Sequence, residues 1–261
     1  MKSLTATLIA IIGLSLCAAS LALADNASFV GKWKLNPDKS QFNGLPYKIE
    51  DAGNGQYRFS FGDDVETLTL DGKGHVTKYG DTWSIKATGP NSWESMNKRE
   101  GKVTAKSKWT ISEDGKTFTT MDENMRPDGS KGQTESILTR TDGTTGLAGT
   151  WESKSVKVMS PLTIEIAKWK EDGYALNNPA YKQHLHFKLD GKDYTPTGPR
   201  VPKGTTVIAS KTDDHMELTY KLNGKTTETD RWELSADGKT LTQTVTYAGV
   251  SKPEVDVYDR Q

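Results

Sequence analysis

The sequence has almost no cysteine and no excess of charge of one sign, and each absence excludes a class of protein. Its single cysteine, Cys17, lies in an N-terminal apolar segment. The rest of the chain therefore has no thiol for a disulfide, a nucleophile or a cysteine-based metal site. The 34 Lys and Arg residues balance 34 Asp and Glu residues. Because phosphate binding needs a basic surface, we do not expect a nucleic-acid partner.

Long hydrophobic runs are also scarce. The apolar run at residues 8–17 follows Lys2, and it is too short to span a bilayer. Ala22 and Ala24 then form a small-x-small cleavage site before Asp25. We predict that residues 1–24 are a cleaved signal peptide and that the mature protein is exported to the periplasm or the extracellular space. No other stretch is apolar enough for us to expect a transmembrane segment.

The chain contains two copies of one module. Residues 109–119 (WTISEDGKTFT) match residues 232–242 (WELSADGKTLT) at seven of eleven positions, with an offset of 123 residues. Near the start of each copy, Gly31-x-Trp33 matches Gly149-x-Trp151. Such self-similarity at a long period indicates duplicated structural units. We predict two domains, residues 26–141 and 147–261, joined by a linker at residues 141–146.

Each copy is predicted to consist of short strands joined by tight turns. Asp-Gly pairs at 71–72, 114–115, 190–191 and 237–238, and Asn-Gly pairs at 54–55 and 223–224, are typical of hairpin turns. Apolar residues alternate between these turns, which indicates antiparallel strands with one polar face. Because a sheet of many strands usually curls or closes, we predict an all-β protein of two tandem antiparallel barrels with about ten short strands each.

The two Gly-x-Trp motifs and two later arginines carry a resemblance to a known family. Gly31-Lys-Trp33 and Gly149-Thr-Trp151 resemble the opening of the first strand in lipocalins and related calycin barrels. The resemblance implies an Arg on the last strand that packs over this Trp and closes the barrel, and Arg140 and Arg260 fall at the expected positions. Ten strands per copy fit the fatty-acid-binding or nitrobindin-like relatives. Residues 29–42 also resemble the start of a group of poorly characterised secreted bacterial proteins.

The predicted barrel interiors are the best place for a binding site. A barrel mouth with aromatic and a few polar groups suits a small molecule. We therefore predict a secreted protein that binds an apolar or aromatic small molecule without catalysis; a packed interior without a cavity is the alternative, and no cofactor or protein partner is indicated. The candidate ligand-binding residues are Trp93, Ser95 and Asn97 in the first copy, and Met216, Leu218 and Tyr220 in the second.

Two other functions stay open. The sequence has no hydrolase, zinc-protease or phosphate-loop motif, so we assign no catalytic residue. A lyase, hydratase or isomerase site inside one barrel remains an alternative, and it would need a histidine or an acid facing a cavity. A structural or protein-interaction module is the third alternative. Three histidines in the second copy are weak metal candidates, although strand alternation places them on the polar face: His184, His186 and His215.

Overall fold

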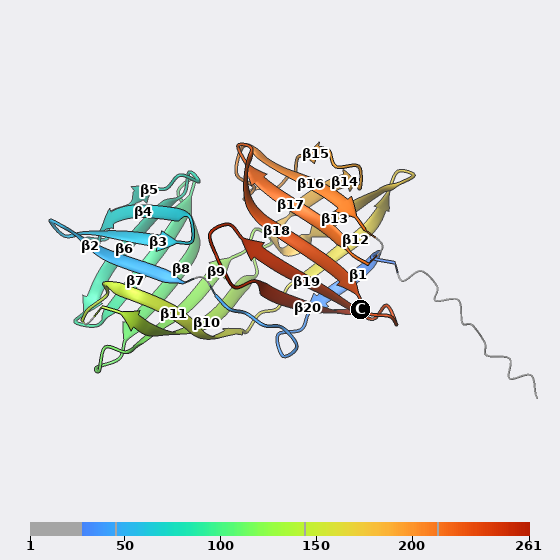
Figure 1. Cartoon of the computed structure of the whole chain (residues 1–261). Helices are drawn as coiled ribbons and strands as arrows, with labels where there is room; N and C mark the ends of the chain where they lie inside the picture. Colours follow the sequence, from blue (N-terminus) through green and yellow to red (C-terminus); the bar gives the residue numbers. More distant parts are fainter. Residues whose placement is uncertain (1–27, 45, 144, 213) are drawn as a thin grey trace, which may run out of the picture.

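The computed structural model describes residues 28–44, 46–143, 145–212 and 214–261. The predicted signal peptide, residues 1–24, lies outside the described residues. The described chain is almost entirely β, and it forms two nearly closed antiparallel sheets of ten strands each (Figure 1). These two sheets confirm the predicted fold class. Among the described residues, no helix is long and apolar enough to cross a membrane.

The first barrel is formed by one continuous stretch of chain. Its strand order is β4-β3-β2-β11-β10-β9-β8-β7-β6-β5, so β4 and β5 are the two edges. The strands are β2 (Tyr47–Gly53), β3 (Gln56–Phe61), β4 (Asp64–Thr69), β5 (His75–Val76), β6 (Thr82–Gly89), β7 (Ser92–Arg99), β8 (Lys102–Ile111), β9 (Thr117–Met125), β10 (Lys131–Asp142) and β11 (Gly149–Val158).

The second barrel combines the rest of the chain with the strand nearest the N-terminus. Its order is β14-β13-β12-β1-β20-β19-β18-β17-β16-β15. A short 3-10 helix, η1 (Pro179–Tyr181), precedes β14. The strands are β1 (Gly31–Leu35), β12 (Thr163–Trp169), β13 (Gly173–Asn178), β14 (Gln183–Lys188), β15 (Asp193–Tyr194), β16 (Thr205–Lys211), β17 (Met216–Leu222), β18 (Lys225–Leu234), β19 (Thr240–Tyr247) and β20 (Glu254–Arg260).

The two copies therefore exchange their first strands. Strand β1 opens the first copy but pairs with β12 and β20 of the second, and β11 opens the second copy but pairs with β2 and β10 of the first. Figure 1 shows the blue β1 among the yellow and red strands of the second barrel. The predicted linker at 141–146 does not join the barrels: Thr141 and Asp142 end β10, and β11 of the same barrel begins at Gly149. The chain crosses between the barrels after β1, which ends at Leu35, and again after β11, which ends at Val158.

Each Trp of a Gly-x-Trp motif is covered by an arginine. The guanidinium carbon of Arg260 lies 4.1 Å from the ring centroid of Trp33, and its three nitrogens donate to the carbonyls of Gly238, Val30 and Ser28 at 2.6 to 2.8 Å. The motif needs glycine because a Cβ on Gly31 would lie 2.5 Å from Arg260 Nη1. These contacts support a structural role for the pair.

The same clamp recurs in the first barrel. The guanidinium carbon of Arg140 lies 4.0 Å from the ring centroid of Trp151, and its nitrogens donate to three backbone carbonyls. Through the strand exchange, each clamp joins an arginine of one copy to the tryptophan of the other. A planar cation over an aromatic face, with its donors on strand-end carbonyls, closes the end of each barrel.

The predicted turns fall into two groups. Asn54-Gly55 and Asn223-Gly224 have positive φ at both residues and join paired strands, β2 to β3 and β17 to β18, as a hairpin turn of type I′ requires. The Asp-Gly turns at 114–115 and 237–238 also join paired strands. The hairpin prediction was wrong at 71–72 and 190–191. These turns lead from one edge strand of a sheet to the other, and the two edges are not paired.

Candidate functional site

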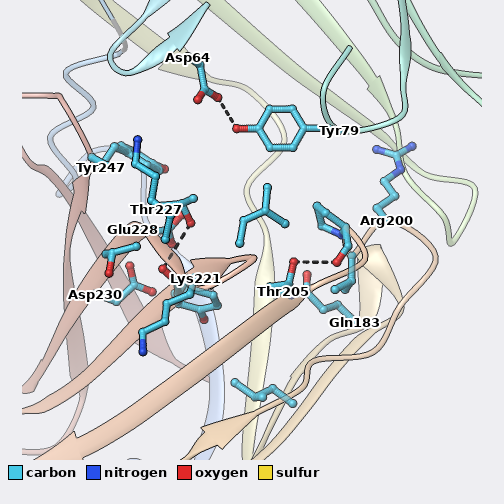
Figure 2. Close-up of a pocket in the computed structure, with 18 of the residues that line it drawn as sticks. Asp64, Tyr79, Gln183, Arg200, Thr205, Lys221, Thr227, Glu228, Asp230 and Tyr247 are labelled. Atoms are coloured by element: carbon cyan, nitrogen blue, oxygen red, sulfur yellow. Dashed lines mark hydrogen bonds between the residues drawn. The ribbon is translucent and has the colours of Figure 1, made fainter. Parts of the chain in front are cut away.

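The second barrel contains a cavity of about 710 Å³ whose mouth faces the first barrel. This volume is within the range of small-molecule sites. Its apolar wall includes Ile164, Leu176 and Leu185, which come from three neighbouring strands. Its polar and aromatic wall comes from β17 to β20, and Figure 2 labels Glu228, Asp230 and Tyr247 of this wall. The residues of the wall are Tyr220, Glu228, Asp230, Trp232, Gln243, Tyr247 and Tyr258.

Strand register explains why acidic and aromatic side chains share this wall. In an antiparallel sheet, directly opposed residues lie on the same face. Tyr220 and Tyr247 both oppose Glu228, while Leu218 and Val245 both oppose Asp230. Since Leu218 is fully buried in the core of the barrel, the side chains of this row point into the barrel.

Asp230 is the most deeply buried acid in the cavity, with 1% of its surface exposed. Its Oδ2 accepts a hydrogen bond of 2.7 Å from Gln243 Nε2. Its Oδ1 has no hydrogen-bond partner among the described residues, and neither does Nε1 of the adjacent Trp232. Burial, and then the charge of the Glu228 carboxylate, raise the pKa of Asp230 well above its usual range. Asp230 is therefore a buried acid whose protonated form is favoured and whose Oδ1 has unused hydrogen-bonding capacity.

Three further carboxyl groups lie near Asp230 on the same face. Burial raises the pKa of Glu228 and of Glu254. Burial and the charges of Glu254 and Glu228 raise the pKa of Asp256 to about 6. The Oδ1 of Asp256 is buried without a hydrogen-bond partner among the described residues. We call Glu228, Asp230, Glu254 and Asp256 the acidic cluster.

The first barrel contributes the mouth of the cavity. Lys225 of the second barrel forms an ion pair of 3.1 Å with Asp63. The hydroxyl of Tyr79 and the amine of Lys78 both donate to Asp64, and Figure 2 shows Asp64 and Tyr79 facing the acidic wall across the cavity. All of these side chains line the cavity. The site is therefore shared between the barrels, with its floor in the second and its rim partly in the first.

The six predicted ligand-binding residues are divided by the structure. Tyr220 lines the cavity, whereas Met216 and Leu218 are fully buried in the packed core of the second barrel. Trp93 and Ser95 are buried in the first barrel, where Ser95 Oγ accepts a hydrogen bond of 2.8 Å from the indole of Trp83. Asn97 is half-buried further along the same strand, β7. The residues from the two copies do not meet in one site.

Aromatic rings pack together in the core of the first barrel. Phe118 contacts Trp109 and Trp151, with ring centroids 5.6 and 5.2 Å apart, and Phe59 lies 5.1 Å from Trp83. At the positions equivalent to Glu228 and Asp230, with the offset of 123 residues, the first copy has Ala105 and Ser107. The interiors of the two copies have therefore diverged.

The three histidines of the second copy are not brought together. His184 is hydrogen-bonded to Asn177 at 2.7 Å, and His186 stacks on Trp169 with ring centroids 5.0 Å apart, both outside the barrel. His215 lies in a turn and contacts Asp214 at 2.7 Å. Among the described residues, no group of three His, Cys, Asp or Glu side chains is arranged to hold a metal ion.

Sequence reasoning missed the acidic cluster, although its signal was present. Glu228, Asp230 and Trp232 are spaced by two along one strand, so an inward Trp232 places both acids inward as well. Asp256 and Tyr258 have the same relation on β20. The sequence analysis assigned these acids no role, because charged residues usually face solvent.

Comparison of the chain with models of protein families, with curated proteins and with solved structures finds no match.

Proposed function

We propose that this protein binds a small molecule in the cavity of the second barrel without transforming it. The observation that carries this proposal is the cavity of about 710 Å³, whose lining includes two residues with a buried, unpartnered polar atom, Asp230 (Oδ1) and Trp232 (Nε1). A buried polar atom without a partner costs about 1–3 kcal/mol. Both atoms are shielded from the cavity, so a ligand recovers that free energy when it draws either side chain into a hydrogen bond.

The walls indicate a ligand with an apolar or aromatic body. Leu176, Leu185 and Tyr258 offer apolar surface, and the polar groups are concentrated on one side. Ligand sites are commonly apolar pockets with a few polar groups that fix orientation. The contribution of the first barrel is to cover the mouth, which reduces the exposure of a bound molecule to water.

Titration of the ¹⁵N-labelled protein with a fragment library tests this function by NMR. We expect fragments that shift amide signals on β14, β17 and β18 and leave those of β6 to β8 unchanged. Leu176→Trp, which fills the cavity, should abolish these shifts. Val76→Trp is the matched control because Val76 is 68% exposed in the first barrel. Shifts that persist in Leu176→Trp, or a library without any binder, would contradict the proposal.

Lipocalin-like ancestry and export are part of the same proposal. The two Trp–Arg clamps support the resemblance to calycin barrels, and the apolar run before Ala24 supports a cleaved signal. Fractionation of cells that express the full chain tests the export. We expect a mature protein outside the cytoplasm with Asp25 as its first residue by mass spectrometry. An intact N-terminus in the cytoplasmic fraction would contradict this.

Catalysis is a second candidate because a carboxyl of raised pKa lines a cavity beside another carboxyl. A carboxyl group that retains its proton can act as a general acid. Incubation of each bound fragment with the protein, followed by NMR, separates the two functions. A fragment that is consumed by the wild type and unchanged by Asp230→Asn supports catalysis, whereas fragments that remain unchanged support binding alone.

A further inference from the structure

The acidic cluster is the chemical feature that distinguishes this cavity. Its four carboxyl groups lie on the inner face of β18 and β20, on either side of β19. On the neighbouring strands β17 and β19, three side chains face the acidic cluster: Tyr220, Gln243 and Tyr247. All three are uncharged at neutral pH. The floor of the cavity therefore offers several acceptors and no cation among the described residues.

The cations that line the cavity belong to its rim and already have partners. Lys225 pairs with Asp63 at 3.1 Å, Lys221 lies 3.8 Å from Asp193, and Lys78 donates to Asp64. The guanidinium of Arg200 donates to a backbone carbonyl of the first barrel and lies 5.7 Å from the Tyr181 ring. None of these groups neutralises the acidic cluster.

Burial of uncompensated carboxyl groups is unfavourable. A buried carboxylate without a counter-ion either takes up a proton or requires a cation. Asp230 is almost fully buried and has one unpartnered oxygen, and Asp256 also has one. Glu228 and Asp230 both line the cavity. Glu228 is partly exposed whereas Asp230 is 1% exposed, so a cation that enters the cavity meets the Glu228 carboxyl first.

We propose that the cavity selects an organic cation, whose protonated amine lies against Glu228, next to the buried Asp230, while its apolar body packs on Leu185, Tyr220 and Tyr258. This inference rests on the proposed binding function and names the class of its ligand. An ammonium group has three donors, which suits a site with two carboxyl groups and a tyrosine hydroxyl. Charge-assisted hydrogen bonds of this kind are about twice as strong as neutral ones.

Proton release is a consequence of this arrangement. Burial raises the pKa of Asp230 well above its usual range, so the protonated form is favoured in the free cavity. A bound ammonium favours the ionised carboxylate and lowers that pKa. Binding of the cation should therefore release protons to the buffer, and the apparent affinity should increase as the pH rises.

Three probes that differ only in charge test the inference: 3-phenylpropylamine, 3-phenylpropan-1-ol and 3-phenylpropanoate. Calorimetric titration of the intact protein should show the amine binding at least about tenfold more tightly than the alcohol, and the propanoate more weakly than the alcohol. Heats measured in buffers of different ionisation enthalpy should show proton release for the amine alone. An alcohol that binds as tightly as the amine would overturn the cation inference while supporting the proposed function. Failure of all three probes at millimolar concentration would count against that function itself.

The double variant Glu228→Gln/Asp230→Asn locates the effect. We expect it to lower the affinity for the amine by at least about tenfold and to change that for the alcohol by less than about threefold. Glu233→Gln is the matched control, since Glu233 lies on the same strand but pairs at 3.0 Å with Arg231 on the outer face. An unchanged preference for the amine in the double variant would overturn the assignment. The probe series on the wild type decides the inference independently of how that variant folds.

Discussion

The acidic cluster makes the second barrel less stable at high pH, and Asp256→Asn measures this cost. Burial and the charges of Glu254 and Glu228 raise the pKa of Asp256 from 3.8 to about 6. Because the folded-state pKa is raised, the protonated form stabilises the folded barrel fully below pH 3.8. This contribution is lost as the pH rises through about 6.

The size of the effect follows from the shift. The pKa of Asp256 is about two pH units higher in the folded than in the unfolded protein, and each pH unit corresponds to about 1.4 kcal/mol. The free energy of unfolding should therefore be about 3 kcal/mol lower in alkaline than in acidic conditions. Asparagine keeps the shape of the protonated acid but has no charge to bury. The variant should therefore match the wild type in stability near pH 4 and exceed it by up to about 3 kcal/mol near pH 8.

Urea unfolding followed by tryptophan fluorescence, repeated across that pH range, measures the difference. Asp259→Asn is the control on the same strand. Asp259 bonds to Lys39 at 2.7 Å and to Asn36 at 2.6 Å, and these partners lower its pKa. Its contribution is present at neutral pH and is lost as the pH falls, so this variant should be less stable than the wild type at pH 7. An Asp256→Asn variant that is destabilised equally at every pH would refute the reasoning.

Two further predictions concern the exchanged strands. In Lys32→Cys/Glu165→Cys, the new cysteines occupy opposed positions on β1 and β12, and we expect a disulfide on mild oxidation, detected by gel mobility and mass spectrometry. In Lys32→Cys/Lys48→Cys, which tests pairing of β1 within its own copy, we expect none; the reverse pattern would show that the strands are not exchanged. Arg260→Ala removes three hydrogen bonds and the contact with Trp33, and should destabilise the second barrel by about 2–4 kcal/mol in urea unfolding. An unchanged midpoint would show that the clamp does not stabilise the barrel.

Local sequence was sufficient for the strands and many of the turns. Alternation with a period of two and the Asn-Gly pairs at 54–55 and 223–224 predicted hairpins that the structure contains. The duplication predicted two similar barrels, and Gly31-x-Trp33 with Arg260 marked a closing contact. These features depend on neighbouring residues, whose spacing alone decides which side chains share a face.

The candidate site could not be predicted from the alternation of residues, because alternation does not tell which face of a strand lies inside the barrel. Spacing places Glu228, Asp230 and Trp232 on one face of a strand, but only the closed sheet makes that face the interior. Once the barrel closes, the two acids line a cavity and the first barrel covers its mouth. Tyr220 was predicted as a site residue because aromatic residues are expected inside a barrel. The two acids were missed because acidic residues are expected outside.

The amino-acid sequence by itself determined the two-barrel architecture, the strands and the clamp residues, whereas the tertiary structure decided which strand completes which barrel. Strands β1 and β11 are equivalent members of the repeat, so either fits the gap in either sheet. β11 follows β10 after the short connection at residues 143–148, and pairing with it closes a small loop. Because short-range closure costs less chain entropy, β11 completes the first barrel and β1 is left to complete the second.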